Sequence, residues 1–242
     1  MNNSFDSIKA LSEYEEKKRE TIEKHMSRKV YFTDLSAQIA DDAEIGENTV
    51  IRSGVVIEPG CRIGKNCVIG PNTVISKSVI GDGVKVNSSQ VYDSAIGKNT
   101  TVGPFAHIRN NCRIGESCRI GNFVELKNSV VKDKSKISHL SYIGDAELGE
   151  NVNMGCGTIT VNYDGIGKYK TKILDNAFVG CNSNLIAPVT IGKGALIAAG
   201  TTVHEDVPDG ALAISRPRQT VKPGGASKIF GLKREKKEKS GE

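Results

Sequence analysis

A histidine stands inside the segment SKISHLSYIGDAELGEN, residues 135–151, where the surrounding chain repeats a short Ile-Gly phrase. A neutral imidazole accepts a proton near pH 7, so His139 is a candidate general base. A lone histidine is also a common surface or hydrogen-bonded residue, and that alternative stays open until its neighbours are placed. The interpretation of His139 therefore depends on which residues the fold brings beside it.

Two cations, Arg109 and Lys127, each follow an aliphatic residue and are 18 residues apart. If 18 residues make one coil of a regular solenoid, the two side chains lie side by side, roughly 5 Å apart. Such charges repel unless an anion lies between them. A phosphate fits, because Arg offers a fork of donors and Lys a point charge. The alternative is a pair of solvated surface charges.

A column of small side chains is predicted beside the histidine. The aliphatic positions of four successive coils align if two turns are one residue shorter than in the regular repeat and if the tract 161–172 forms a loop within a single unit. The residues two places after the aliphatic position in these coils are His139, Cys156, Cys181 and Ala199. Three of the four are small, so the column predicts a narrow groove for a long, thin ligand, with the histidine at one end.

These alignments depend on a repeat of six residues. Aliphatic residues recur every sixth position in three unbroken ladders, 39–75, 102–126 and 173–203, and a typical unit is IGKNCV. Neither the helical period nor strand alternation explains a period of six. Hexapeptide repeats are the signature of a parallel β-helix, in which each unit is a short strand and a turn. We therefore predict an all-β solenoid over residues 31–215.

Four of the six cysteines, Cys61, Cys67, Cys112 and Cys118, occupy the small interior position of the repeat, which predicts buried side chains in a reducing compartment. No CxxC pair and no Cys/His zinc spacing is present, so no metal site is predicted. The first thirty residues contain no apolar run, which predicts a cytoplasmic protein with no membrane partner.

The segment before the repeats, residues 1–30, is predicted to form a helical arm of about 20 residues. It is interpreted either as a connecting arm or as a cap over the open edge of the first coil. The apolar residues expected to form one stripe along it are Phe5, Ile8, Leu11, Ile22 and Met26.

The basic character of the chain belongs to its end. The net charge is +5, and residues 216–242 hold nine Lys and Arg against three Glu, so the remaining body is close to neutral. The run KREKKEKSGE, residues 233–242, is typical of a solvated, disordered end. Nucleic-acid binding would instead require a basic face on the fold itself, and no nucleic-acid partner is predicted.

With these residues laid out, the chain resembles the left-handed β-helix acyltransferases, and more closely the acetyltransferase domain of the bacterial bifunctional enzymes that make UDP-N-acetylglucosamine. The matching phrases, over roughly residues 100–220, are GPFAHIR, GNFVELK, SHLSYIGDAELGENVNMGCGTIT, NYDG, KYKT, FVGCNSNLIAPVTIGKGALIAAGTTV and ALAISR. The resemblance implies a left-handed helix of strands and a homotrimer with sites between subunits. It also implies transfer of acetyl from acetyl-CoA to the amine of glucosamine 1-phosphate, by direct attack with His139 as base and without a metal.

The resemblance assigns the site residues to two groups. Arg109 and Lys127 would hold the sugar phosphate, while Tyr142 and Asn153 would contact the sugar. Glu125 is expected one coil from Tyr142, where it would orient either His139 or the amine. The residues that the resemblance places along acetyl-CoA are Cys156, Asn162, Tyr163, Cys181, Ala199 and Arg216.

The chain departs from the family pattern in three ways. Positions 156 and 181 are usually Ala and Ser in the family and are both Cys here, which keeps a covalent acetyl-cysteine route open beside direct transfer. His107 replaces a residue that is often Arg. No nucleotidyltransferase half precedes the arm, so we expect that activity to be absent, and a separate uridylyltransferase partner stays open.

Three other functions are weighed. Another amino sugar, phosphorylated or nucleotide-linked, is an alternative acceptor. A γ-type carbonic anhydrase shares the β-helix but needs three zinc-binding histidines, and one of the four here lies on the arm, so three converging ligands are not expected. A catalytically inactive trimeric scaffold is the alternative from another class.

Overall fold

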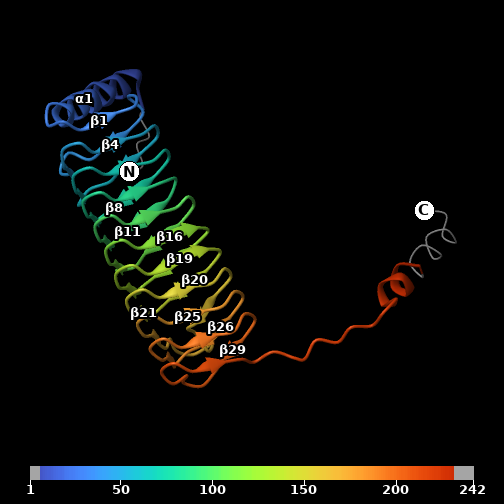
Figure 1. The fold of residues 1–242 in the computed structure, drawn as a ribbon. Coiled ribbons are helices and arrows are strands. Elements are labelled where there is room, and N and C mark those ends of the chain that lie inside the picture. Colours follow the sequence, from blue (N-terminus) through green and yellow to red (C-terminus); the bar gives the residue numbers. More distant parts are fainter. Residues whose placement is uncertain (1–5, 232–242) are drawn as a thin grey trace.

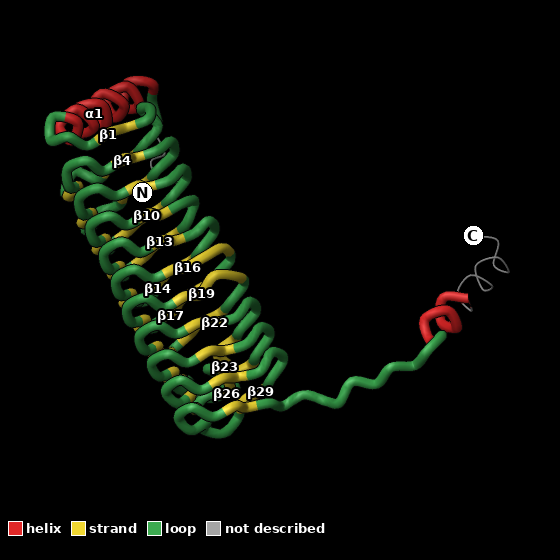
Figure 2. Tube along the Cα trace, in the orientation of Figure 1, coloured by secondary structure: helices red, strands yellow, loops and turns green. Residues whose placement is uncertain are grey.

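The computed structural model describes residues 6–231 and shows a long solenoid with one helix across its first end (Figure 1). The helix is α1 (Ile8–Met26). Within these residues, 30 short strands pair in parallel to form three sheets, which are the three faces of the solenoid (Figure 2). The predicted left-handed parallel β-helix is confirmed.

Each sheet takes every third strand of the chain, except at the last step of the first sheet. The first sheet consists of β1 (Tyr31–Phe32), β4 (Val50–Ile51), β7 (Val68–Ile69), β10 (Lys85–Val86), β13 (Thr101–Val102), β16 (Arg119–Asn122), β19 (Lys136–His139), β22 (Asn153–Met154), β25 (Phe178–Val179), β28 (Leu196–Ile197) and β30 (Leu212–Ala213). The second consists of β2 (Gln38–Ile39), β5 (Val56–Ile57), β8 (Val74–Ser76), β11 (Gln90–Tyr92), β14 (His107–Arg109), β17 (Glu125–Lys127), β20 (Tyr142–Gly144), β23 (Ile159–Val161), β26 (Asn184–Ile186) and β29 (Thr202–Val203). The third consists of β3 (Glu44–Ile45), β6 (Arg62–Ile63), β9 (Val79–Ile80), β12 (Ala95–Ile96), β15 (Arg113–Ile114), β18 (Val130–Val131), β21 (Ala146–Leu148), β24 (Thr171–Ile173) and β27 (Val189–Ile191).

The aliphatic residue of the repeat forms the core. In the second sheet, for example, Ile108 pairs with Leu126 and Leu126 with Ile143, and all three are fully buried. These aliphatic residues stack on their equivalents in the neighbouring coils, so one continuous apolar core runs along the solenoid. The corners between strands carry residues with positive φ, many of them Asn, which adopts this conformation more readily than most non-glycine residues.

The predicted stacking is confirmed. Met154 pairs with Ile137, Val179 with Met154 and Ile197 with Val179, so the coils align with the two short turns and with the loop inside one unit. The part of the predicted 161–172 tract that leaves the solenoid is residues 162–170, between β23 and β24.

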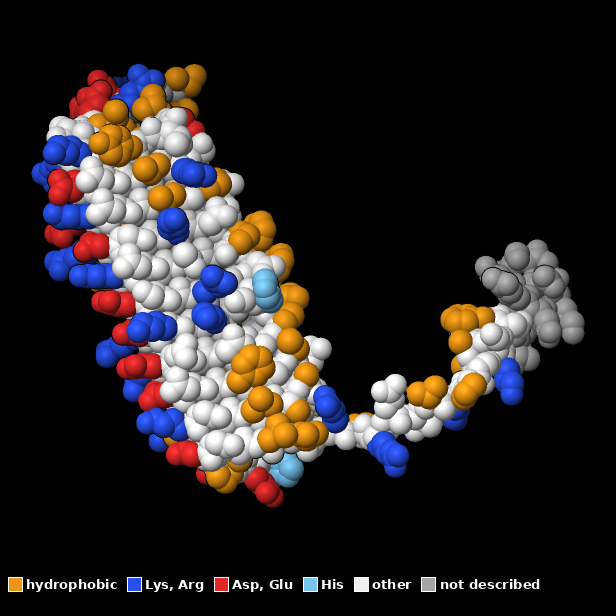
Figure 3. All heavy atoms as spheres, in the orientation of Figure 1, with side chains coloured by type: hydrophobic (Ala, Val, Ile, Leu, Met, Phe, Trp, Pro, Cys, Tyr) orange, Lys and Arg blue, Asp and Glu red, His pale blue; other side chains and the backbone are white. Residues whose placement is uncertain are grey.

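The charged side chains are spread unevenly over the outer surface. Opposite charges alternate along one edge of the solenoid (Figure 3). Ion pairs between neighbouring coils include Glu44 with Arg62 and Asp175 with Lys193. The side chains of these pairs are mostly exposed, so each pair contributes at most about 1 kcal/mol to stability.

Helix α1 lies over the first coil, as expected of a cap, but its predicted apolar stripe is wrong. Ile8, Leu11 and Met26 are 84%, 44% and 54% exposed, while the buried residues of the helix are Ile22 and His25. The helix lies against strands β1 and β2 and pairs Lys17 with Asp41, and its exposed apolar residues lie away from this contact. Phe5 lies outside the described residues.

The chain leaves the solenoid after β30 as an extended segment and forms a short helical stretch at residues 225–231 (Figure 1). The predicted basic tail, residues 216–242, includes this stretch, and the segment predicted to be disordered, residues 233–242, lies outside the described residues. Among the described helices, none is long and apolar enough to cross a membrane.

Candidate functional site

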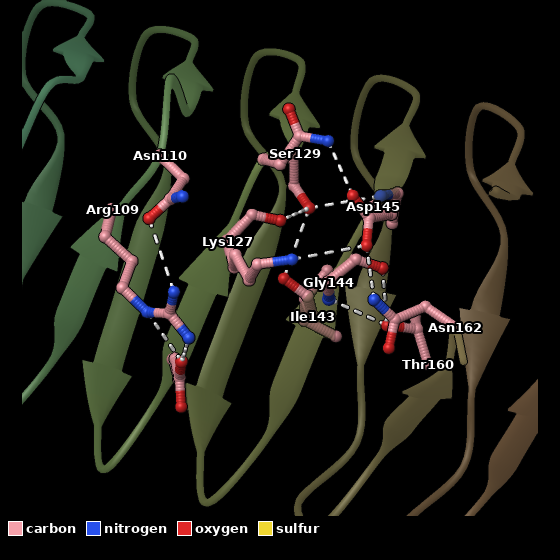
Figure 4. Close-up of polar contacts among 12 residues, drawn as sticks. Arg109, Asn110, Lys127, Ser129, Ile143, Gly144, Asp145, Thr160 and Asn162 are labelled. Atoms are coloured by element: carbon pink, nitrogen blue, oxygen red, sulfur yellow. Dashed lines mark hydrogen bonds and ion pairs between the residues drawn. The ribbon is translucent and has the colours of Figure 1, made fainter. Parts of the chain in front are cut away.

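Arg109 and Lys127 end the neighbouring strands β14 and β17 and are paired in register, as predicted (Figure 4). Each also has a carboxylate partner. Arg109 donates from Nε and Nη2 to Oε1 of Glu125, at 2.9 and 2.5 Å, and Nζ of Lys127 lies 3.5 Å from Oδ2 of Asp145. The two carboxylates already balance the two charges, so repulsion between the cations does not by itself require an anion.

Asp145 is the centre of a polar network beside this pair (Figure 4). It is buried, and its carboxylate accepts hydrogen bonds from the side-chain amides of Asn128, at 2.5 Å, and of Asn162. Burial by itself raises the pKa of Asp145, but these bonds and the charge of Lys127 outweigh it and hold that pKa below its ordinary value. The network ties the base of the 162–170 loop to Lys127.

A third cation comes from the loop and was missed by the sequence analysis. The loop folds back on itself through a bridge between Tyr163 and Lys168 and a hydrogen bond of 2.9 Å from the backbone N of Tyr169 to the carbonyl of Asn162. The neighbouring ammonium of Lys127, and also Arg109, lower the pKa of Lys168. Three cations therefore face two carboxylates, which leaves a positive surplus. The phrase KYKT contains this lysine, but its sequence alone does not show the direction of the loop.

His139 ends β19, where it pairs with Asn122 of β16. Its Nδ1 lies 2.6 Å from Oδ1 of Asn122. A carbonyl oxygen only accepts, so Nδ1 carries a proton in this contact, and in the neutral ring Nε2 then keeps a free lone pair. His139 is exposed, so a ligand on the surface can reach Nε2. The residue that orients the histidine in the structure is therefore Asn122, whereas Glu125 is held by Arg109.

The long pairing of β16 with β19 depends on a glycine. A Cβ on Gly121 would lie 1.8 Å from the carbonyl oxygen of Ser138, next to His139. We predict that Gly121→Ala lowers the free energy of unfolding by about 3 kcal/mol, because backbone must move to remove the overlap. Urea unfolding would measure this. Gly167→Ala is the control, since its nearest neighbour is the end of the Tyr169 side chain at 3.3 Å; an equal loss in both variants would contradict the prediction.

The predicted column beside His139 is present at the corner between the first and second sheets. Its backbone is linked from coil to coil by hydrogen bonds to the carbonyl oxygens of His139, Cys156 and Cys181, at 3.4, 2.8 and 2.8 Å. Cys156 is half-buried, and Cys181 and Ala199 are exposed. Arg216 reaches the far end, where Nη1 donates to the carbonyl of Ala199 at 2.9 Å.

The remaining predicted residues lie on both sides of this corner. Tyr142 begins β20, half-buried and stacked on Glu125 as predicted. Asn153 begins β22, on the first sheet. Asn162 belongs to the Asp145 network, and the exposed Tyr163 donates from its hydroxyl to the carbonyl of Gly165 at 2.7 Å. Within one chain, Asn162 and Tyr163 thus follow the last residue of β23, at the edge of the second sheet opposite the cysteine column, and do not lie along that column.

The four histidines do not converge. His25 is buried in α1, His107 packs edge-on against the ring of Tyr92 and His204 lies beside Glu205. Among residues 6–231, no group of three or more His, Cys, Asp or Glu is arranged to hold a metal ion.

Known proteins share both the repeat and the sequence. Residues 42–77, 93–128 and 170–205 match the family model "Bacterial transferase hexapeptide (six repeats)". The chain is 64% identical over 145 residues to the bifunctional protein GlmU of Caldanaerobacter subterraneus subsp. tengcongensis, an alignment covering 60% of this chain and 32% of that protein. It is 48% identical over 149 residues to GlmU of Clostridioides difficile, covering 62% and 32%. The chain therefore spans about a third of the length of the curated relatives it matches.

Two solved structures have the same fold. The UDP-N-acetylglucosamine acyltransferase of Campylobacter jejuni gives a TM-score of 0.56 at 23% identity, covering 62% of this chain and 66% of that chain. The corresponding protein of Francisella novicida gives 0.54 at 19% identity, covering 75% and 65%. At these identities the likeness concerns the fold alone. The family model and the GlmU relatives confirm the resemblance of the sequence to these bifunctional enzymes, and the two solved structures confirm the fold.

Proposed function

We propose that this hexapeptide-repeat β-helix, similar to about a third of GlmU, is an acetyltransferase that moves acetyl from acetyl-CoA to the amine of glucosamine 1-phosphate. The observation that carries the proposal is the arrangement of side chains on the outer face of the second sheet. Arg109 and Lys127 lie along one edge of that face, and His139 lies at the other. The side chains of Glu125 and Tyr142 stack between them.

The size of this face suits a sugar phosphate. Asn122, the pairing partner of His139, is five residues from Lys127, so the Cα atoms at the two edges are at most about 18 Å apart. A phosphorylated amino sugar, together with the side chains that contact its phosphate and its amine, is long enough to span this distance. The phosphate lies toward Lys127 and Lys168, where positive charge is in surplus, and the amine lies toward His139.

The reaction then needs one base. The amine nitrogen attacks the carbonyl carbon of the thioester while Nε2 of His139 accepts a proton from the nitrogen. When the carbon–sulfur bond breaks, the departing CoA sulfur takes that proton from the histidine. Asn122 leaves Nε2 free to accept that proton, because it accepts the hydrogen bond from Nδ1. This direct route uses neither cysteine as a nucleophile.

Acetyl-CoA fits the column that starts at His139. A long, thin ligand laid along Cys156, Cys181 and Ala199 has its thioester at the histidine and its phosphates toward Arg216. Asn162 and Tyr163 belong to the opposite corner of the same chain, so they reach the cofactor from a neighbouring subunit. The proposal therefore includes a homotrimer with sites between chains, as the family resemblance implies.

Lys168 is predicted to bind the acceptor phosphate. Lys168→Ala is expected to raise the KM for glucosamine 1-phosphate about tenfold, with little change in kcat, because a charge-assisted contact is worth roughly 1.5 kcal/mol. Lys170→Ala is the matched control in the same loop, since Lys170 pairs with Glu147 at 2.5 Å on the third sheet. Steady-state kinetics would measure both. An unchanged KM in Lys168→Ala would place the phosphate elsewhere.

The proposed reaction is tested by following CoA release from acetyl-CoA with a panel of acceptors: glucosamine 1-phosphate, glucosamine, glucosamine 6-phosphate and a nucleotide-linked amino sugar. Turnover with glucosamine 1-phosphate well above the others is the expected result. A preference for another amino sugar would keep the acetyl transfer and change the acceptor. Failure to bind acetyl-CoA at all would favour the inactive scaffold.

A further inference from the structure

Two cysteines stand at the same position of adjacent coils. Cys156 follows β22 by two residues and Cys181 follows β25 by two, and these strands are paired in register. The backbone N of Asn182 donates to the carbonyl of Cys156 at 2.8 Å, so the ladder continues through the two cysteines. Both are free thiols at the surface of the column, Cys156 half-buried and Cys181 exposed.

The spacing of adjacent coils matches the reach of a disulfide. Paired strands are about 4.8 Å apart, and the Cα atoms of a disulfide are roughly 4.4 to 6.8 Å apart. Two side chains that point the same way from adjacent coils have Cβ atoms about as far apart as the strands. This distance is slightly longer than the usual Cβ–Cβ distance of a disulfide, about 3.5 to 4.5 Å, so forming the bond draws the two corners together. A bond formed under such strain is readily reduced again.

The other four cysteines differ in both burial and neighbours. They point into the solenoid, where burial raises the pKa of the thiols of Cys61, Cys67, Cys112 and Cys118. They also stack on hydroxyl residues rather than on each other, as when the backbone N of Cys118 donates to the hydroxyl of Thr100. Of the six, only the pair on the column is both accessible and adjacent, and all six lie within the described residues.

The geometry points to a reversible dithiol switch formed by Cys156 and Cys181, which a small-molecule disulfide oxidises. The exposed thiolate of Cys181 attacks one sulfur of the small disulfide and expels one thiol, leaving a mixed disulfide. The thiolate of Cys156 then attacks Sγ of Cys181 and expels the second thiol. Two protein thiols and one small disulfide thus give one protein disulfide and two small thiols, and a reducing thiol reverses both steps.

The consequence for the column is loss of its ligand. The disulfide draws together two neighbouring corners that lie next to His139 along the column and places two bonded sulfurs where the acyl-CoA chain would lie. We expect the oxidised protein to lose acetyl transfer at least tenfold. This step rests on the proposed function, whereas formation of the disulfide does not.

The experiment treats the full chain with oxidised glutathione, quenches with acid and measures intact mass, free thiols and the cysteine-linked peptides. The expected result is a mass decrease of about 2 Da, a fall from six free thiols to four and a linked peptide pair containing Cys156 and Cys181. Cys156→Ala should instead keep a glutathione on Cys181. The matched control Cys156→Ala/Cys181→Ser should stay unmodified, and acetyl-CoA should protect the wild type.

Two outcomes would overturn the switch: two separate glutathione adducts on the wild type, or a disulfide that joins Cys181 of one chain to another chain. Because mass and thiol counts need no substrate, the two proposals fail separately. A disulfide that forms in a protein without any acetyl transfer would reject the proposed function alone. Full activity in the disulfide form, with no protection by acetyl-CoA, would place the cofactor away from the column.

Discussion

Replacing His139 by alanine is expected to lower kcat/KM for acetyl transfer about a thousandfold, within the range of 10² to 10⁴ that a positioned general base supplies. The effect should fall on kcat, because the histidine takes its proton as the new bond forms and contributes little to substrate binding. The protein should remain folded, since His139 is exposed and lies outside the apolar core. Coupled detection of released CoA would measure the loss.

Two further variants separate this role from a structural one. His204→Ala removes an exposed histidine near the far end of the solenoid, beside Glu205, and should leave kcat within twofold. Asn122→Leu should lower kcat about tenfold at constant KM, because Nδ1 loses the acceptor that fixes its proton. Asn122→Asp keeps an acceptor oxygen and should restore most of that loss. Equal activity of Asn122→Leu and wild type would remove Asn122 from the mechanism.

The fold could be predicted because each six-residue unit repeats the same local arrangement of one strand and one turn. A period of six can bury one aliphatic residue per unit only if successive strands stack, so spacing alone placed Arg109 beside Lys127. Placing Cys156 beside Cys181 also required the 161–172 tract to loop out of a single unit. The arm helix was less predictable. Its apolar residues follow a helical period, but burial depends on the size of the facing surface, and the buried residues of the helix are Ile22 and His25.

The site was predictable where residues follow the repeat and not where they leave it. The column from His139 to Ala199 follows from counting, as does the stacking of Glu125 on Tyr142. Lys168 lies in a nine-residue loop whose direction is set by its own hydrogen bonds, which no periodicity encodes. Glu125 was expected to orient His139 or the amine, but it binds Arg109, and Asn122 binds His139 instead. These partners depend on how far each side chain extends across the coils, which sequence position does not give.

Asp145→Ala is the change expected to cost the most stability among the polar residues, about 3 kcal/mol of the free energy of unfolding. The substitution leaves the largely buried ammonium of Lys127 without its counter-ion and removes the acceptor of the amides of Asn128 and Asn162. Because Asn162 begins the 162–170 loop, Lys168 should also lose its place beside Lys127, and the KM for the phosphorylated acceptor should rise. Glu147→Ala, which removes an exposed ion pair with Lys170, should change stability by less than about 1 kcal/mol.

The same carboxylate predicts how stability depends on acid. The pKa of folded Asp145 lies below its ordinary value, since hydrogen bonds and Lys127 outweigh the effect of burial, so folding favours the ionised form. That contribution is fully present above the unfolded pKa, near 3.9, and is lost as the pH falls through the lower folded pKa. Urea unfolding between pH 7 and 3 should therefore show a smaller acid loss in Asp145→Ala than in wild type. Parallel curves for the two proteins, offset by a constant amount, would show that folding does not shift the pKa of Asp145 and would contradict the prediction.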